Sequence, residues 1–379
     1  MRIRSIAIAV VVALALALGW PVAASAAGPT PATTSVVVAD STISIGETSL
    51  VTITFSGPVT GFTNADLTIA NGTLGAVSSL DGGSTWSATF TPTAGITDAT
   101  NVITVNLAGT ADAFGDAGSG TASSNNYAVD TQRPTATVVV ADNGLSAGET
   151  SLVTITFSEA VVGFSNTDLM IANGTLGAVG SSDGGITWTA TFNPTAGITD
   201  ATNVITLDLT GLQDGAGNAG IGTTDSNNYA IDTERPSATV VVADSSLSAG
   251  ETSLVTITFS EAVTGFSNAD LMIANGTFGA VGSMDGGVTW SATFTPTAGI
   301  TDATNVITLD LTGVQDAAGN AGTGTVDSNN YAIDTVEVTP IASLLAATGV
   351  QASGILITGL MLLLLGAAAL VARRRHQRA

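Results

Sequence analysis

The 379-residue sequence has no cysteine and no lysine, and its only histidine is His376. A chain without cysteine has neither disulfides nor a thiol nucleophile. Ser-His-Asp and Cys-His mechanisms would lack their base, and a zinc site built from His or Cys is excluded. The absence of lysine excludes isopeptide cross-links and pilin polymerisation through a lysine nucleophile. Only carboxylate chemistry of the glycosidase or aspartic-protease type remains open, so we expect a non-catalytic protein.

Positive charge is scarce between Ala27 and Thr348, where Arg133 and Arg235 are the only cations. All 30 acidic residues lie in the same stretch, which therefore has a net charge of about −28 against −22 for the whole chain. Such a surface repels nucleic acid and anionic lipid, keeps a protein soluble and attracts divalent cations. We therefore expect no nucleic-acid partner.

The first residues have the three parts of a secretory signal. Arg2 and Arg4 precede an apolar run from Ile6 to Leu18, and Ala24-Ser25-Ala26 supplies small residues for cleavage. This pattern predicts a signal peptide over residues 1–26, removed before Ala27, and hence a secreted protein.

The last residues have a second three-part pattern. The pentapeptide Leu345, Ala346, Ala347, Thr348, Gly349 precedes an apolar run, and the chain ends in an arginine cluster over residues 373–379. About 20 apolar residues span a bilayer as a helix, and flanking arginines stay cytoplasmic. We therefore predict a transmembrane helix over residues 354–372 with a basic cytoplasmic tail.

This terminal pattern resembles the cell-wall sorting signal of Gram-positive surface proteins, in the LAxTG variant associated with the actinobacterial class of sortases. The resemblance implies that a sortase cleaves between Thr348 and Gly349 and joins Thr348 to peptidoglycan. It places the protein in the cell wall or on the surface of a Gram-positive, actinobacterial cell, with the membrane as a partner only before sorting. A plain membrane-anchored ectodomain is the alternative, since Ala, Gly and Thr are common throughout the chain.

The middle of the chain repeats itself with a period of 102 residues: GETSLVTITFS begins at 46, 148 and 250, and PTAGITDATNVIT begins at 92, 194 and 296. A period of this length is that of a domain rather than of a solenoid unit. Within each copy, apolar and polar residues alternate, as in Val153, Ile155 and Phe157. Alternation of this kind is typical of half-buried antiparallel strands, and about seven strands in ~100 residues favour an immunoglobulin-like sandwich.

The predicted fold is therefore all-β, with three tandem Ig-like domains. The full predicted order is a signal peptide (1–26), a linker (27–34), three repeats (35–132, 133–234, 235–336), a wall-proximal linker (337–344), the sorting motif (345–349), the transmembrane helix (354–372) and the tail (373–379).

The segments VVVAD, TFSEAV, DLMIANGTL, DGGITWTATF and a D-x-x-G-N loop resemble the bacterial Ig-like repeats of large surface adhesins and biofilm proteins. The resemblance implies an Ig-like fold and a stalk or adhesin. We expect the repeated Trp86, Trp188 and Trp290 to pack in the core rather than to form a sugar-stacking platform. We expect Tyr127, Tyr229 and Tyr331 to be half-buried, and the repeated Asn-Gly pairs to form turns.

Acidic residues are predicted to gather at the joints between copies. The loop after the second strand and the loop before the last strand share the pole at which a domain begins, so both should lie beside the linker from the preceding copy. Oxygen ligands gathered without a nearby cation other than an arginine suit calcium. The predicted ligand sets are Asp130, Glu159, Asp214 and Asn218 at one joint, and Asp232, Glu261, Asp316 and Asn320 at the other.

The first copy has Gly57 where the others have glutamate, and the sequence has no repeat before it. The resemblance agrees with calcium, since calcium rigidifies inter-domain joints in several such adhesins. The alternative is that these Asp and Asn residues only shape turns.

The sequence thus predicts a non-catalytic, wall-anchored stalk or adhesin that acts in cell adhesion or biofilm formation, with an unidentified surface ligand. A wall enzyme acting on carbohydrate through paired carboxylates is the alternative.

Overall fold

The computed structural model describes residues 34–337. The predicted signal peptide, the LAATG motif, the transmembrane helix and the basic tail lie outside these residues. No helix within the described part is long and apolar enough to cross a bilayer.

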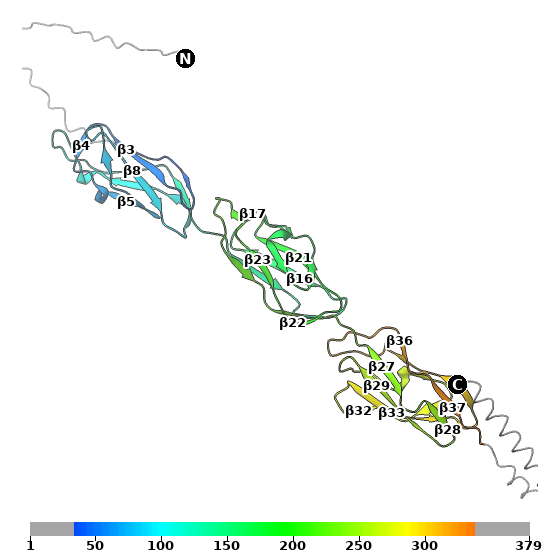
Figure 1. Ribbon diagram of the computed structural model, residues 1–379. Coiled ribbons are helices and arrows are strands. Elements are labelled where there is room, and N and C mark those ends of the chain that lie inside the picture. Colours follow the sequence, from blue (N-terminus) through cyan, green and yellow to red (C-terminus); the bar gives the residue numbers. More distant parts are fainter. Residues whose placement is uncertain (1–33, 338–379) are drawn as a thin grey trace, which may run out of the picture.

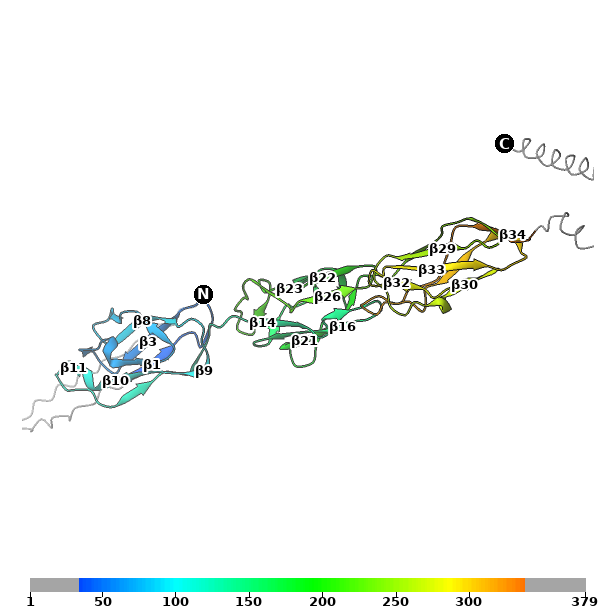
Figure 2. The ribbon, with the colours of Figure 1, turned by 90° about the horizontal axis from the view of Figure 1, so that it is seen from below.

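The described chain is all-β and forms three sandwich domains that follow one another in a line (Figures 1 and 2). This confirms the predicted fold class. Its only helices, among residues 34–337, are four single-turn 3₁₀ helices: η1 (Asn64–Asp66), η2 (Leu107–Gly109), η3 (Asn166–Asp168) and η4 (Asn268–Asp270).

The strands of copy 1 are β1 (Thr34–Val38), β2 (Thr42–Ile43), β3 (Ser49–Phe55), β4 (Val59–Thr60), β5 (Leu67–Ile69), β6 (Gly72–Leu74), β7 (Ser78–Ser79), β8 (Thr85–Pro92), β9 (Thr97–Asn101), β10 (Ile103–Asn106), β11 (Ala111–Asp112), β12 (Thr121–Ser123) and β13 (Tyr127–Asp130). Those of copy 2 are β14 (Ala136–Val140), β15 (Gly144–Leu145), β16 (Ser151–Phe157), β17 (Val161–Val162), β18 (Leu169–Ile171), β19 (Gly174–Leu176), β20 (Gly180–Ser181), β21 (Thr187–Pro194), β22 (Thr199–Asn203), β23 (Ile205–Asp208), β24 (Gln213–Asp214), β25 (Thr223–Asp225) and β26 (Tyr229–Asp232).

The strands of copy 3 are β27 (Ala238–Val242), β28 (Ser246–Ser248), β29 (Ser253–Phe259), β30 (Leu271–Ile273), β31 (Gly276–Phe278), β32 (Gly282–Ser283), β33 (Thr289–Pro296), β34 (Thr301–Asn305), β35 (Ile307–Asp310), β36 (Thr325–Asp327) and β37 (Tyr331–Asp334). These segments are shorter and more numerous than the seven strands expected in each copy. Several of them, such as β15, β17, β20 and β24, are only two residues long. The pairing of β22 with β26 also contains a register shift between Asp200 and Asn203, and the other copies have an equivalent shift.

Each sandwich has two layers with a constant order of strands. In copy 2 the first sheet runs β14-β16-β21-β19, with β20 also paired to β21, and we call this sheet and its equivalents the first sheet. The opposite layer is formed by β18-β23-β25 and by β15-β26-β22, in which β15 runs parallel to β26. We call this layer the second sheet.

The core lies between the two layers. Val153 and Ile155 on β16 are fully buried and belong to one cluster with Ile205 and Leu207 on β23. Equivalent clusters fill copies 1 and 3. Each copy thus encloses its own core, as the alternation in the sequence predicts.

The tryptophans pack against this core. Trp188 is partly buried, lies edge-to-face with Phe164 at 5.2 Å between ring centroids, and donates its indole N–H to Gly185 at 3.1 Å. The prediction of core packing is confirmed. The Asn-Gly turns are also confirmed, because Asn71, Asn173 and Asn275 all have φ between 53° and 58°, the left-handed region that asparagine tolerates.

The expected half-burial of the tyrosines is wrong. Tyr127, Tyr229 and Tyr331 are all 0% exposed. In copy 1 the ring packs edge-to-face on Phe90, and its hydroxyl donates to the carbonyl of Ala70 at 2.9 Å. A polar partner inside the fold lets the whole side chain be buried, which alternation along a single strand does not indicate.

Candidate functional site

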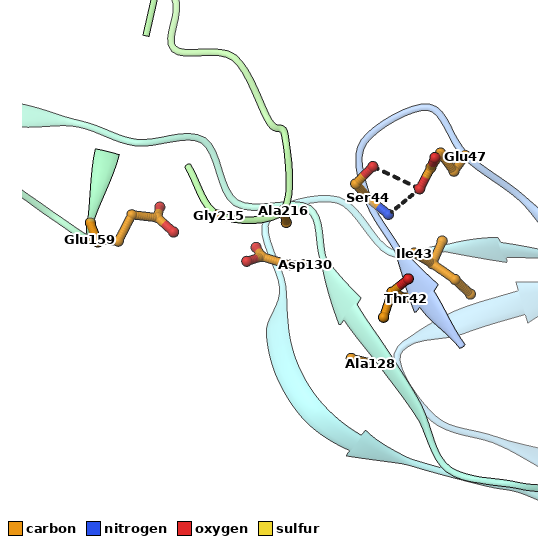
Figure 3. A pocket seen from close by; sticks show the side chains of 10 residues that line it. Thr42, Ile43, Ser44, Glu47, Ala128, Asp130, Glu159, Gly215 and Ala216 are labelled. Carbon is orange, nitrogen blue, oxygen red and sulfur yellow. Dashed lines mark hydrogen bonds between the residues drawn. The ribbon is translucent and has the colours of Figure 1, made fainter. Parts of the chain in front are cut away.

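Three carboxylates meet at each joint between domains. Asp130 ends β13 of copy 1, Glu159 follows β16 of copy 2, and Asp214 ends β24. One oxygen of each lies within 4.8 Å of the others. Figure 3 shows the side chains of Asp130 and Glu159 turned toward each other from the two domains. The second joint has the same arrangement in Asp232, Glu261 and Asp316.

The buried member of each trio is held by its own loop. Asp214 is 2% exposed, and its Oδ1 accepts the backbone N–H groups of Ala216 and Asn218, both at 2.8 Å. Asp130 is half-buried and accepts the hydroxyl of Thr97 at 3.0 Å. The backbone therefore fixes Asp214, so this carboxylate faces its neighbours whether or not an ion is bound.

The trio is electrostatically strained in the absence of a cation. Burial, followed by the charges of Asp214 and Asp130, raises the pKa of Glu159 above its ordinary value. Burial likewise raises the pKa of Glu261, with further contributions from Asp316, Asp232 and Glu234. These carboxylates repel one another and would be stabilised by a positive charge.

The two arginines of the described chain lie at these joints, but both donate to backbone carbonyls of the following domain. Arg133 Nη1 donates to Ala219, and Arg235 Nη1 donates to Ala321 at 2.6 Å. They therefore help to orient the linkers on the domains that follow them.

The asparagine of each D-x-x-G-N loop joins the two domains directly. Asn218 Nδ2 donates to the carbonyl of Asp130 at 2.9 Å and to Asp214 Oδ2 at 2.8 Å, while its Oδ1 accepts the N–H of Ile45 at 2.8 Å. Asn320 repeats this pattern with Asp232, Asp316 and the N–H of Ala147. The side-chain amide is therefore a buried clamp between domains.

The predicted ligands therefore divide into two groups. The structure brings the three carboxylates of each predicted set together, whereas the asparagines lie beside them with their carbonyl oxygens already accepting a backbone N–H. Sequence reasoning missed the partners of this clamp, Ile45 and Ala147. A signal was present, since the asparagine recurs in copies 2 and 3 and copy 1 has Asp116 instead.

An open groove of about 670 Å³ lies beside the first joint. Glu47, Asp130 and Glu159 line it together with small residues such as Ala128 and Ala216 (Figure 3). Glu47 accepts the N–H of Ser44 at 2.8 Å and its hydroxyl at 2.7 Å, which lowers its pKa. The groove gives solvent and small cations a route to the trio.

The equivalent pole of copy 1 keeps the loop but lacks the other features. Asp112 Oδ1 accepts the N–H groups of Phe114 at 2.8 Å and Asp116 at 3.0 Å, as Asp214 does in copy 2. Gly57 supplies no carboxylate, and Phe114 is 93% exposed. The aspartate thus shapes the turn in all three copies, and the glutamate and asparagine are what distinguish a pole that forms a joint.

The chemistry of the trio suits a hard cation. Calcium prefers six to eight oxygen ligands and accepts carboxylates in mono- or bidentate form. Three carboxylates whose oxygens lie within 4.8 Å of one another, one of them held by backbone amides, match this preference, and water can supply the remaining ligands. The residues present therefore fit calcium.

Comparison with solved structures finds distant likenesses. The Escherichia coli adhesin FdeC is 15% identical, with a TM-score of 0.30, and the match covers 80% of this chain and 98% of that one. The Yersinia pseudotuberculosis adhesin InvE is 16% identical, with a TM-score of 0.24, over 52% of this chain and 58% of that one. Likeness at this level carries no argument about function. No curated protein matches the chain.

The model of one protein family matches the chain three times in succession. The family is described as Bacterial Ig-like domain, and the matches cover residues 29–129, 130–231 and 232–333. They include most of the sequence and all three sandwiches. The chain therefore belongs to the Bacterial Ig-like domain family, with three tandem copies of the domain.

Proposed function

We propose that this protein is a non-catalytic stalk or adhesin on the surface of a Gram-positive cell, and that calcium stiffens its two joints. The observation that carries the proposal is the recurrence of the same carboxylate trio at both joints. Copy 1 lacks the glutamate at its equivalent pole, and no domain precedes it among the described residues.

The composition of each trio explains how an ion would stiffen a joint. Asp130 belongs to one domain, whereas Glu159 and Asp214 belong to the next. An ion bound to all three would tie the domains together and offset the burial and the neighbouring charges that raise the pKa of Glu159. The clamp of Asn218 and the linker contact of Arg133 hold the same joint by hydrogen bonds, so calcium would add stiffness to an ordered frame.

The calcium proposal can be tested on a fragment of residues 34–337, in which every core cluster closes within one copy. Adding calcium after EDTA is expected to raise the melting temperature, because an ion that binds only the folded joint stabilises it by mass action. Small-angle scattering is expected to show a narrower distribution of lengths. The double variant Glu159→Gln with Glu261→Gln should lose both responses.

The matched control is Asp225→Asn with Asp327→Asn, which removes the same charge from exposed residues on the second sheet. This control should respond to calcium as the unaltered fragment does. An unchanged melting temperature and scattering curve in the unaltered fragment would refute calcium stiffening.

We further propose that the protein is attached to peptidoglycan through Thr348. The first support is the order of motif, apolar run and arginine cluster in residues 345–379, which lie outside the described structure. The second is the row of Ig-like domains that precedes these residues, a family that suits a cell-surface protein. Muralytic release followed by mass spectrometry should find a C-terminal peptide that ends at Thr348 and bears a wall fragment. Recovery of an intact Arg378-Ala379 terminus would show instead a protein that stays in the membrane.

A further inference from the structure

Copy 1 carries exposed apolar side chains on the loops at its end away from copy 2, where the short strands β4 and β11 pair with each other (Figures 1 and 2). Phe114, which follows β11, is 93% exposed, and Leu80, in the loop between β7 and β8, is fully exposed. All 11 phenylalanines of the sequence lie within the described residues, and Phe114 is the only one of them that is exposed. This ring therefore has no part in the core of copy 1.

The loops that carry these two side chains lie on either side of β4. The backbone N–H of Val59 on β4 donates to the carbonyl of Gly83 at 3.1 Å, whereas the neighbouring Thr60 pairs with Ala111 on β11. The two apolar side chains are thus parts of one surface. We call this surface the outer pole of copy 1, and it consists of residues 56–60, 79–84 and 111–117.

A hollow of about 160 Å³ opens in the outer pole. Its walls include Pro58, Val59, Ala113 and Phe114. Pockets that enclose a small-molecule ligand are typically ~300–1,000 Å³. The hollow is therefore too small for most such ligands and suits a single apolar side chain inserted by a partner.

Copies 2 and 3 show that the fold does not require the exposed ring. The residues equivalent to Phe114 are Ala216 and Ala318. Ala216 lines the groove of the first joint together with Asp130 of the preceding domain (Figure 3), so a small residue is understandable there. A phenylalanine ring in water is unfavourable and contributes nothing to the fold. Its presence at the outer pole therefore indicates a contact with another molecule.

The charge around the ring identifies the chemistry of that molecule. Copy 1, over residues 35–132, contains no lysine, arginine or histidine, and three of its carboxylates belong to the outer pole: Asp81, Asp112 and Asp116. Hydrogen bonds, led by the one from the backbone N–H of Thr85, lower the pKa of Asp81 to about 2, so this group is charged at any physiological pH. Charge complementarity therefore favours a basic partner.

The same carboxylates are poorly placed to bind a polysaccharide. Asp112 Oδ1 accepts the N–H groups of Phe114 and Asp116, and Asp81 Oδ1 accepts those of Ser84 at 3.1 Å and Thr85 at 2.8 Å. Carboxylates that are already bonded within their own loops have less to offer the directional hydrogen bonds of sugar hydroxyls. Their charge still attracts a cation, because Coulomb attraction does not require a free lone pair.

We propose that the outer pole of copy 1 is a docking site for a basic segment of a partner protein. The segment inserts one aliphatic or aromatic side chain beside Phe114 and places Lys or Arg near Asp81 and Asp116. The proposal rests on the surface function proposed above, to which it adds a binding site at the end of the described row farthest from copy 3. A contact of this size is weak by itself, so firm adhesion requires many stalks to engage together.

A selection experiment in EDTA tests the proposal without involving the joints or the wall. A random library of short displayed peptides is selected on an immobilised fragment of residues 27–337, which adds the predicted start of the exported chain to the fragment used above. The double variant Leu80→Ser with Phe114→Ala, which gives this pole the residues of copy 2, is present as a soluble competitor. The surviving peptides are expected to combine Lys or Arg with an aliphatic or aromatic residue.

Fluorescence anisotropy with the selected peptides then measures affinity. The double variant should bind at least tenfold more weakly than the unaltered fragment, and rising sodium chloride should weaken binding because the charges are exposed to solvent. The matched control is Met284→Ser, which removes an equally exposed apolar side chain from the loop of copy 3 that corresponds to the loop of Leu80. This control should bind as the unaltered fragment does. Calorimetry should show every variant folded, because the altered side chains are exposed.

Three outcomes would overturn the proposal. The selection could yield no peptide that distinguishes the fragment from the double variant, or only acidic and uncharged peptides. The selected peptides could bind a fragment of residues 34–337 but not one of residues 27–337, which would mean that the chain's own residues 27–33 occupy the pole. The unaltered fragment, but not the double variant, could bind purified cell-wall polysaccharide, which would make the pole a glycan site.

Discussion

The pole of copy 1 and the equivalent pole of copy 2 share a backbone and differ in a few side chains. In both, an aspartate closes the loop before the last strands by accepting two backbone N–H groups, Asp112 in one and Asp214 in the other. Copy 2 adds Glu159 and Asn218, where copy 1 has Gly57 and Asp116. The fold provides the loop in either case, and two side chains turn a free pole into a joint.

Asn218 and Glu159 have different functions at the joint. Asn218 holds the domains together by hydrogen bonds that need no ion. Glu159 adds a charge that burial and its neighbours disfavour. Glu159 weakens the joint when no ion is bound, so its presence favours a bound ion. Asn218 stabilises the joint with or without an ion.

The largest effect is expected when Asn218 of copy 2 is replaced by aspartate, the residue that copy 1 has at this position. Asn218→Asp removes the N–H that bonds Asp130 and places a second carboxylate against Asp214, at a site only 2% exposed. In EDTA this should destabilise the domain by about 3 kcal/mol. Urea unfolding of the fragment of residues 34–337, followed by tryptophan fluorescence and compared with the unaltered fragment, measures the change.

The matched control is the reverse change in copy 1, Asp116→Asn. Asp116 is exposed, so this variant should alter stability by no more than about 0.5 kcal/mol. Equal losses at the two positions would mean that the asparagine stabilises the loop alone and is not a clamp between domains.

A smaller effect is expected in the domain cores, where the tyrosine hydroxyls of copies 1 and 3 differ in their hydrogen bonds. Tyr127 donates its hydroxyl to Ala70 at 2.9 Å, whereas the hydroxyl of Tyr331 is buried without a hydrogen-bond partner in the described chain. Tyr127→Phe should therefore cost about 1 kcal/mol, and Tyr331→Phe should cost nothing or stabilise the protein slightly. Scanning calorimetry of the two variants measures this difference, and equal losses would contradict it.

The smallest effect is a dependence of the joints on pH. The pKa of Glu159 is raised in the folded protein, so protonation favours the folded joint. In EDTA, this stabilisation is fully present below the ordinary glutamate value of 4.5 and is lost as the pH rises through the raised pKa. The melting temperature should therefore rise as the pH is lowered from neutral toward about 4.5.

The variant Glu159→Gln with Glu261→Gln should flatten this trend, and saturating calcium should reverse it by favouring the ionised carboxylates. The turn aspartates set the lower limit of the experiment. Hydrogen bonds to Asp183, above all the one that the backbone N–H of Thr187 donates, lower the pKa of this carboxyl to about 2. The contribution of Asp183 to the stability of the folded protein is present above the ordinary aspartate pKa of 3.8 and is lost as the pH falls toward about 2.

Much of the fold and part of the site could be predicted because their signals are local or periodic. The 102-residue repeat marks the copies, and alternation along strands such as β16 marks the face that is buried. The meeting of Asp130, Glu159 and Asp214 followed from placing two loops at one pole of a sandwich. Whether calcium binds the trio remains a prediction.

The recurrence of the asparagine in copies 2 and 3 indicates a role for Asn218 at the joint, but it does not distinguish a metal ligand from a clamp, because an asparagine can serve as either. The choice depends on the amide of Ile45, which lies 173 residues away in the sequence and in another domain. The burial of Tyr127 likewise depends on Ala70, which is 57 residues away. Contacts of this range are formed only when separate loops converge.

The order of amino acids is enough to establish a row of similar β domains with an acidic surface, because repetition, alternation and charge are properties of the chain. Which polar residues meet at the joints is established by the folded structure. Hydrogen bonds and repulsion act over a few ångströms. Their partners are therefore set by the way loops and strands pack, and the order of residues does not show them.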